Sequence, residues 1–163
     1  MTRGQDGTVR LPFGNMRFRV EIDGISGGGA FEVVFPEARI AGRGRNGRRV
    51  LYGPLILRRG LTAACDWYDW WDTARRARTP ASRFVRIVLL DSEGADAMRW
   101  RFRGALPVAY HLSPLQALGD APVIESLELS IAGFTADNET GILGSCIDFK
   151  IAGSAAFQLL PTT

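Results

Sequence analysis

The stretch Leu51–Trp71, LYGPLILRRGLTAACDWYDWW, joins a short apolar run to an aromatic-rich segment across a Gly-Leu-Thr turn. Gly53-Pro54 marks the start of the apolar run Leu55–Arg59, whose length and composition predict a β-strand. The aromatic segment predicts an α-helix with Thr62 as its N-terminal cap. We expect the helix to end before Thr79-Pro80, because the residue before a proline avoids the helical region.

Three tryptophans of this helix recur at three- and four-residue spacing with Ala74, and therefore lie on one apolar stripe. They are Trp67, Trp70 and Trp71. The stripe predicts core packing. An aromatic ligand cage is the alternative, but no polar group nearby supports it.

The 163 residues suggest a single soluble globular domain, with 46% hydrophobic and 23% charged residues. Of the twenty basic residues, all but Lys150 are arginine, while the net charge is only +3. Arginine pairs well with carboxylates and phosphates, which favours an anion site or a protein interface. The coding bias of a GC-rich genome explains the same composition, so both interpretations stay open.

The start of the chain, Met1–Arg10, is polar and glycine-rich and does not resemble a signal peptide. No apolar run reaches the length of a membrane span. Cys65 and Cys146 have no metal-ligand spacing and are expected to be buried free thiols of a reducing compartment. These features predict cytoplasmic assembly without membrane contact.

Most of the remaining chain shows the alternation of apolar and polar residues that is typical of β-strands. The expected strands are Arg17–Asp23, Phe31–Ile40 with an interruption at Pro36, Phe84–Asp91, Met98–Arg103 with an extended continuation to Leu112, and Val123–Phe134. In the last of these strands Ser126, Glu128 and Ser130 form a polar face opposite Leu127 and Leu129. The fold is therefore predicted to be mainly β with one helix.

The segment Gly42–Arg49, GRGRNGRR, predicts a basic hairpin loop, because Asn46-Gly47 favours a tight turn. A subunit contact is the favoured interpretation of this loop, ahead of a solvated hairpin. A nucleic-acid patch is the third alternative, but no aromatic residues interleave for base stacking. The candidate contact residues are Gly42, Arg43, Arg45, Asn46, Arg48 and Arg49.

Nothing in the sequence assembles a catalytic or metal site. His111 is the only histidine, and a nucleophilic triad would have to use it beside Ser113 or a cysteine. No nucleophile motif and no metal-ligand cluster accompanies it. We therefore expect a protein without cofactor or metal that is not an enzyme, with a small hydrolase as the weaker alternative.

The C-terminal segment 135–163 is predicted to be an extension of the β domain 1–134. Its first part, Thr135–Gly144, is polar and predicts a linker. Ile147, Phe149 and Ile151 then alternate with Asp148 and Lys150, which predicts one extra strand that needs a sheet edge. These three apolar residues are candidates for an assembly contact.

The order and spacing of six segments resemble the tail tube proteins of contractile phage tails and phage-tail-like contractile injection systems. The segments are Asn15–Gly24 (NMRFRVEIDG), Arg48–Thr62 (RRVLYGPLILRRGLT), Trp67–Trp71, Ile87–Gly94 (IVLLDSEG), Trp100–Pro107 (WRFRGALP) and Glu125–Phe134 (ESLELSIAGF). No single motif is specific, but the series covers roughly residues 13 to 135.

The resemblance implies a β-sandwich or barrel-like subunit with one flanking helix, whose strands join a shared inner β-barrel in a hexameric ring. Rings would stack into a hollow tube inside a sheath, with sheath and baseplate proteins as partners and cargo or DNA in the lumen. Ser126, Glu128 and Ser130 would then face the lumen. Two departures, the short basic loop Gly42–Arg49 and the long tail, raise the alternative of a tube-initiator ring at the baseplate.

Overall fold

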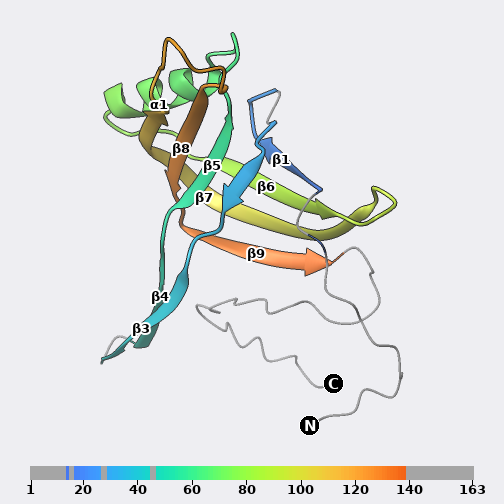
Figure 1. Cartoon of the computed structure of the whole chain (residues 1–163). Coiled ribbons are helices and arrows are strands. Elements are labelled where there is room, and N and C mark those ends of the chain that lie inside the picture. The colour runs from blue at the N-terminus through green and yellow to red at the C-terminus, as the bar shows by residue number, and fades with distance from the viewer. Residues whose placement is uncertain (1–13, 15–16, 27–28, 45–46, 139–163) are drawn as a thin grey trace, which may run out of the picture.

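The computed structural model describes residues 14, 17–26, 29–44 and 47–138, which form nine strands and one helix (Figure 1). The elements are β1 (Phe18–Ile22), β2 (Glu32–Val34), β3 (Ala38–Gly44), β4 (Gly47–Tyr52), β5 (Leu55–Gly60), α1 (Asp66–Arg76), β6 (Arg83–Leu90), β7 (Asp96–Leu112), β8 (Ile124–Ser130) and β9 (Gly133–Asn138).

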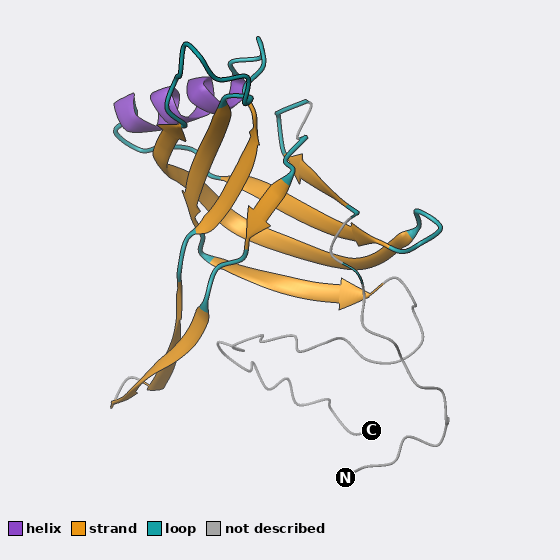
Figure 2. Cartoon of the chain, viewed as in Figure 1, coloured by secondary structure: helices purple, strands orange, loops and turns teal. Residues whose placement is uncertain are grey.

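Two antiparallel sheets share the long strand β7. Sheet A, as we name it, has the order β1-β6-β7-β9 and uses the N-terminal half of β7. Sheet B has the order β2-β5-β8-β7 and uses the C-terminal half. The separate hairpin β3–β4 extends away from both, and α1 lies at the opposite end of the molecule (Figures 1 and 2). The predicted β-sandwich with one flanking helix is confirmed.

A bend at Gly104 lets β7 serve both sheets. Gly104 has a φ of 66°, which side chains disfavour, and a Cβ there would lie 2.7 Å from the Cβ of Ala132. A β-bulge at Val108 follows, between the pairs Pro107–Leu129 and Ala109–Glu128. The predicted extended segment after Arg103 is therefore the second half of one continuous strand.

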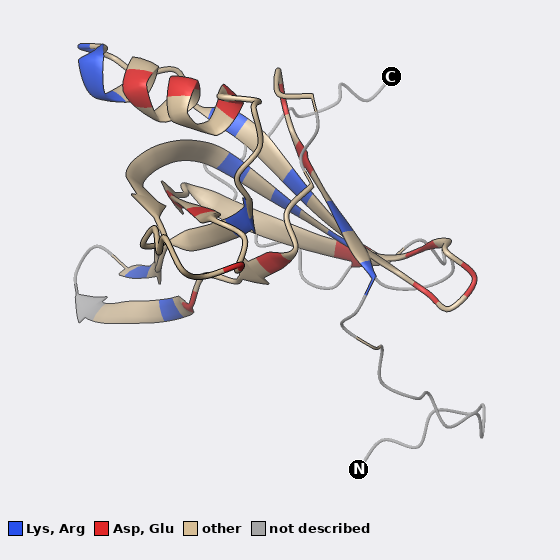
Figure 3. Ribbon diagram, turned by 45° about the horizontal axis from the view of Figure 1, so that its top comes forward, with Lys and Arg blue, Asp and Glu red and all other residues tan. Residues whose placement is uncertain are grey.

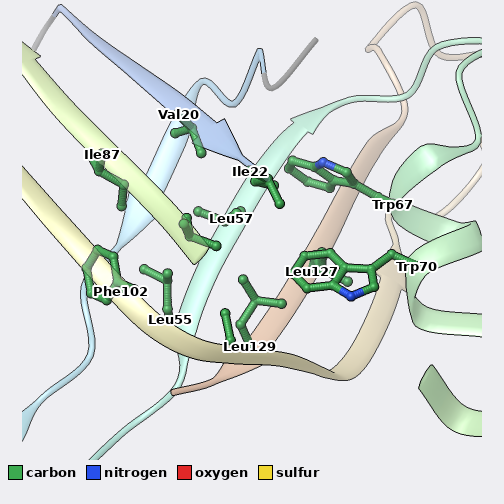
Figure 4. Close-up of a cluster of buried hydrophobic side chains, with 12 residues drawn as sticks. Val20, Ile22, Leu55, Leu57, Trp67, Trp70, Ile87, Phe102, Leu127 and Leu129 are labelled. Carbon is green, nitrogen blue, oxygen red and sulfur yellow. The ribbon is translucent and has the colours of Figure 1, made fainter. Parts of the chain in front are cut away.

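The core lies between the two sheets and under α1 (Figure 4). The alternating residues predicted to face inward are buried in β1, β5 and β8, and they meet side chains from β6, β7 and the helix. The fully or almost fully buried members include Val20, Ile22, Leu55, Leu57, Trp67, Trp70, Val85, Ile87, Phe102, Leu127 and Leu129.

The helix differs from the prediction at its start. It begins at Asp66 after Cys65, which makes no side-chain cap, whereas Thr62 only accepts a hydrogen bond from the Ala64 N–H at 3.3 Å. The carboxylate of Asp66 instead accepts from the Trp67 N–H at 3.0 Å, so an acidic residue inside the first turn satisfies an open donor. Cys65 is exposed, which corrects the prediction that its thiol is buried.

The predicted strand Val123–Phe134 is two strands, because the chain turns at Ile131-Ala132. After the turn, β9 pairs with the free edge of the N-terminal half of β7, from Arg103–Gly133 to Met98–Asn138. Thr135 to Asn138 therefore belong to a strand and not to a linker, and the boundary placed after residue 134 cuts through β9. Pro36 divides the predicted strand Phe31–Ile40 in the same way, into β2 and β3.

Candidate assembly surfaces

A buried ion-pair cluster fixes α1 onto sheet B. Arg59 on β5 donates from Nε to Oε1 of Glu125 on β8 at 2.5 Å, and its guanidinium also pairs with Asp66 on α1. The Tyr110 hydroxyl on β7 donates to the other oxygen of Glu125 at 2.8 Å. The guanidinium lies 4.1 Å above the ring of Trp67. Three strands and the helix therefore meet at one network of ion pairs and hydrogen bonds.

The electrostatics of this cluster favour a fixed structural role. Burial opposes the charge of Arg59, yet hydrogen bonds to Asp66 and Glu125 outweigh it, and its pKa is raised. Burial and the hydrogen bond to Glu125 also raise the pKa of Tyr110 above its ordinary value. Arg59 thus stays cationic and Tyr110 stays neutral near pH 7, and neither is poised for proton transfer.

Sequence reasoning missed this cluster, although a signal for it exists. Glu125 has the same parity along β8 as the buried Leu127 and Leu129, and Arg59 has the same parity along β5 as Leu55 and Leu57. Two opposite charges at core-facing positions of paired strands predict a buried ion pair.

Both edges of sheet B are unpaired among the described residues. One edge is β2, and the other is the C-terminal half of β7 beyond Ala105. Exposed apolar side chains lie along both edges: Phe31, Val34 and Phe35 at β2, and Val108 and Leu112 at β7. An unpaired strand edge with exposed apolar side chains promotes aggregation unless another strand pairs with it.

The predicted lumen-face residues lie together on the face of sheet B that is turned away from the core. Ser126 and Glu128 are half-buried and Ser130 is exposed. Cross-strand pairing places Ser126 between Arg58 and His111, and Arg58 donates to the carboxylate of Glu32 at 3.0 Å. This face carries one paired arginine and the carboxylate of Glu128, together with the apolar side chains of Ile56 and Val34 in the same cross-strand row as Glu128.

The predicted basic loop is the end of the β3–β4 hairpin. Gly42 has a φ of 88°, and the register shifts between Ala41 and Gly44, as a bulge requires. Arg48 and Arg49 on β4 are exposed. The side chains of Arg43, Arg45 and Asn46 lie outside the described residues.

The helix stripe is divided between two environments. Trp67 and Trp70 lie in the core, whereas Trp71 is half-buried and packs against Tyr68 and Tyr110 with ring centroids 5.9 and 6.1 Å away. The guanidinium of Arg75 lies 5.3 Å from the Trp71 ring centroid. The tryptophans thus contact side chains of α1 and of the sheets, which favours core packing over a ligand cage. The tail residues Ile147, Phe149 and Ile151 lie outside the described residues.

Sheet A carries a ladder of arginines and carboxylates on its outer face. Figure 3 marks the positions of these residues along the ribbon. Arg19 of β1 forms a bidentate pair with Asp96 at 2.6 and 2.7 Å, and Arg99 adds a third hydrogen bond to that carboxylate at 3.2 Å. The hydrogen bonds from Arg19 hold the pKa of Asp96 below its ordinary value. Most of the charge on this face is compensated within the subunit.

The hydrolase alternative finds no support in the geometry. His111 is exposed on β7 opposite Ser126, and the Ser113 hydroxyl oxygen accepts a hydrogen bond from the Ile124 N–H at 2.9 Å. Within the described part of the chain, no cluster of three or more His, Cys, Asp or Glu side chains is placed to hold a metal. The one helix described there lacks the length and apolar character needed to cross a bilayer.

Residues 14–135 match the family described as "T4-like virus tail tube protein gp19". This is a family of structural proteins, as the non-enzymatic prediction requires. Comparison with curated protein sequences gives no match.

Solved structures with the same fold come from contractile injection systems. A chain of the PVC sheath/tube terminator in the extended state has a TM-score of 0.65 and 16% identity, and the match covers 80% of this chain and 99% of that one. A chain of the PVC sheath-tube complex gives 0.61 and 16%, with 80% and 94% covered. A chain of the anti-feeding prophage baseplate gives 0.57 and 21%, with 80% and 98% covered. At these identities the likeness establishes the fold.

Proposed function

Because the chain belongs to the T4-like virus tail tube protein gp19 family, we propose that it is the inner tube subunit of a contractile phage tail or contractile injection system. Six copies would close into a ring, and rings would stack into a hollow tube. The partners would be further copies of the chain, sheath proteins and baseplate proteins, with cargo or DNA passing through the lumen. Assembly would take place in the cytoplasm before the particle is complete.

The two open edges of sheet B are the observation that carries this proposal. The four strands alternate in direction, so β2 of one copy would lie antiparallel to β7 of its neighbour, and the alternation would continue around a closed ring. Closing the sheet removes both exposed edges. Four strands from each of six subunits give a barrel of 24 strands, and barrels of this size enclose an open channel.

In this arrangement the polar face with Ser126, Glu128 and Ser130 would line the lumen. The ion-pair ladder on the outer face of sheet A would then face the sheath. The serines, the carboxylate of Glu128 and the Arg58–Glu32 pair on this face support a water-filled channel, while Leu55, Leu57, Leu127 and Leu129 of the same strands pack in the core.

A lysine on the open β7 edge should prevent ring closure without unfolding the subunit. Val108 is 55% exposed at the bulge, so Val108→Lys should leave the melting temperature nearly unchanged. Pairing with a neighbouring strand would bury its charge, and we expect the concentration needed for ring formation to rise roughly tenfold or more. Light scattering after size-exclusion chromatography and negative-stain images measure this. Val108→Thr keeps the branched shape and should form rings, and a Val108→Lys protein that forms normal rings would contradict edge pairing.

The alternative is a tube-initiator ring at the baseplate. The C-terminal segment 135–163 is the feature of the chain that favours it. A repeated subunit presents the same faces to the rings above and below, so a long extra strand suits a ring with a unique neighbour. We propose that the tail, with Ile147, Phe149 and Ile151, adds to an assembly contact.

Removing residues 139–163 tests the tail and preserves β9. We expect this truncation to leave the melting temperature of the subunit unchanged and to weaken ring stacking or the joint to the baseplate, as measured by sedimentation and particle imaging. Truncation from Thr135 is the comparison: it also removes four β9 residues paired with β7, and should destabilise the subunit itself. Normal assembly, contraction and ejection without 139–163 would remove the main support for the initiator alternative.

A further inference from the structure

Among the described residues, the two most exposed large apolar side chains lie on the loop 113–123 between β7 and β8. Leu115 is 81% exposed and Leu118 is 105% exposed, whereas the next values, for Phe84 and Ile40, are 57%. Two leucines that make almost no contact within their own subunit indicate a surface that another protein covers.

The loop is held in shape by its own hydrogen bonds. Ser113 and Ile124 close its neck, with the Ser113 N–H donating to the Ile124 carbonyl at 2.8 Å and the Ile124 N–H donating to the Ser113 hydroxyl at 2.9 Å. The Gly119 N–H donates to the Gln116 carbonyl at 3.1 Å, which forms a turn and directs Leu118 outward. An open hollow of about 750 Å³ lies among the loop residues. Leu115 and Leu118 therefore lie on a loop whose conformation is fixed by hydrogen bonds.

Strand β5 connects this loop to the basic hairpin at the other end of the molecule (Figure 1). The hairpin base is closed by the Gly53 N–H, which donates to the Glu37 carbonyl at 2.8 Å, and β5 begins two residues later. At the far end of β5, the Leu61 N–H donates to the Val123 carbonyl of the loop at 2.8 Å. A six-residue strand separates these two features by roughly 20 Å.

Side-by-side pairing of sheet B edges would turn the strand ends into the two rims of a ring. This step rests on the proposed function. The loop 113–123 would lie on one rim and the β3–β4 hairpin on the other, so rings that stack head to tail would bring the loop of one copy onto the hairpin of another. Such a heterologous contact does not close on itself and yields an open-ended filament.

The two rims are complementary in charge as well as position. On the loop side Asp69 and Asp120 are exposed, and neither forms an ion pair with another described residue. On the hairpin side Arg48 and Arg49 are exposed beside Ile40. Each rim thus offers an apolar centre, with Asp69 and Asp120 on the loop side and Arg48 and Arg49 on the hairpin side. The C-terminal end of α1 adds exposed arginines to the loop side, and two of them, Arg75 and Arg76, are paired with Asp72.

We propose that the loop 113–123 is the ring-to-ring contact, and that its occupant is the β3–β4 hairpin of a second copy in the next ring. Leu115 and Leu118 bury their exposed surface on the hairpin. The carboxylates of Asp69 and Asp120 meet its arginines.

The combined change Leu115→Ser and Leu118→Ser in the full chain separates stacking from ring closure. We expect rings with the wild-type elution volume and melting temperature, and a protein concentration for tube formation raised roughly tenfold or more, as measured by sedimentation and negative-stain imaging. Phe84→Ser is the matched control, because it removes an exposed apolar side chain from the outer face of sheet A and should leave tubes intact. Tubes at the wild-type concentration from the leucine variant would overturn the inference while leaving the ring proposal standing. A wild-type chain that forms neither rings nor tubes would overturn both.

A charge exchange identifies the occupant. Asp69→Arg with Asp120→Arg should weaken stacking most at low salt, because screening reduces the repulsion between like charges. Adding Arg48→Asp and Arg49→Asp to the same chain should restore it. Failure of this rescue, with rings still formed, would exclude the hairpin as the occupant.

Discussion

Replacing Glu125 by alanine is expected to lower the free energy of unfolding of the subunit by about 3–5 kcal/mol, because it leaves Arg59 and the Tyr110 hydroxyl without their buried partner. Glu125 is 1% exposed and Arg59 is 4% exposed. For a domain of this size the loss corresponds to a melting temperature lower by roughly 6–20 °C. Urea denaturation followed by tryptophan fluorescence gives the free energy directly.

The half-exposed pair Glu32–Arg58 provides the control. Glu32→Ala breaks an arginine–glutamate ion pair at the surface of sheet B and should cost less than about 1 kcal/mol. The combined change Arg59→Met with Glu125→Leu should recover part of the loss, because it removes the two most buried charges at similar volume but leaves Asp66 and the Tyr110 hydroxyl without these partners. If Glu125→Ala costs no more than Glu32→Ala, the cluster does not hold α1 in place.

The second large effect is expected for Trp67→Ala, at about 3–5 kcal/mol of unfolding free energy. The ring of Trp67 is fully buried, and its loss leaves a cavity under the Arg59 guanidinium. Trp71→Ala should cost less than half as much, because Trp71 is half-buried at the edge of the core. The soluble yield and the urea midpoint of the two variants measure the difference.

Trp67→Phe gives a matched control for the ring itself. The indole N–H of Trp67 has no hydrogen-bond partner among the described residues, so phenylalanine removes an unsatisfied donor and keeps an aromatic ring. We expect it to cost clearly less than Trp67→Ala. If Trp67→Ala costs no more than Trp71→Ala, the placement of Trp67 in the core and Trp71 at its edge is contradicted.

Local patterns predicted the elements that depend on local sequence. The alternation around Leu55–Leu57 and Leu127–Leu129 predicted both the strands and their buried faces, and Gly53-Pro54 marked the start of β5. The tryptophan spacing predicted the helix. It did not predict that the helix begins at Asp66, whose carboxylate pairs with Arg59 on β5.

Features that depend on distant pairing could not be predicted in this way. The turn at Ile131-Ala132 allows β9 to pair with the otherwise unpaired edge of β7, which lies thirty or more residues earlier in the chain. The open edges of sheet B follow from the full pairing order, so Phe31 and Val108 gave no local sign that they lie at the two edges of one sheet. Charged residues at inward positions, such as Arg59 and Glu125, looked like polar-face residues until their strands were paired.

The bend in β7 makes position 104 unusually intolerant of substitution. An alanine there would be strained by the positive φ and would also press against Ala132, and asparagine, which accepts that φ, would still meet the same methyl group. Because β7 is a strand of both sheets, a distortion of its backbone at residue 104 would disturb the strand pairing of sheet A and of sheet B. In a library that samples every position of this chain, residue 104 should accept glycine alone, although it lies at a surface bend and makes no side-chain contact of its own.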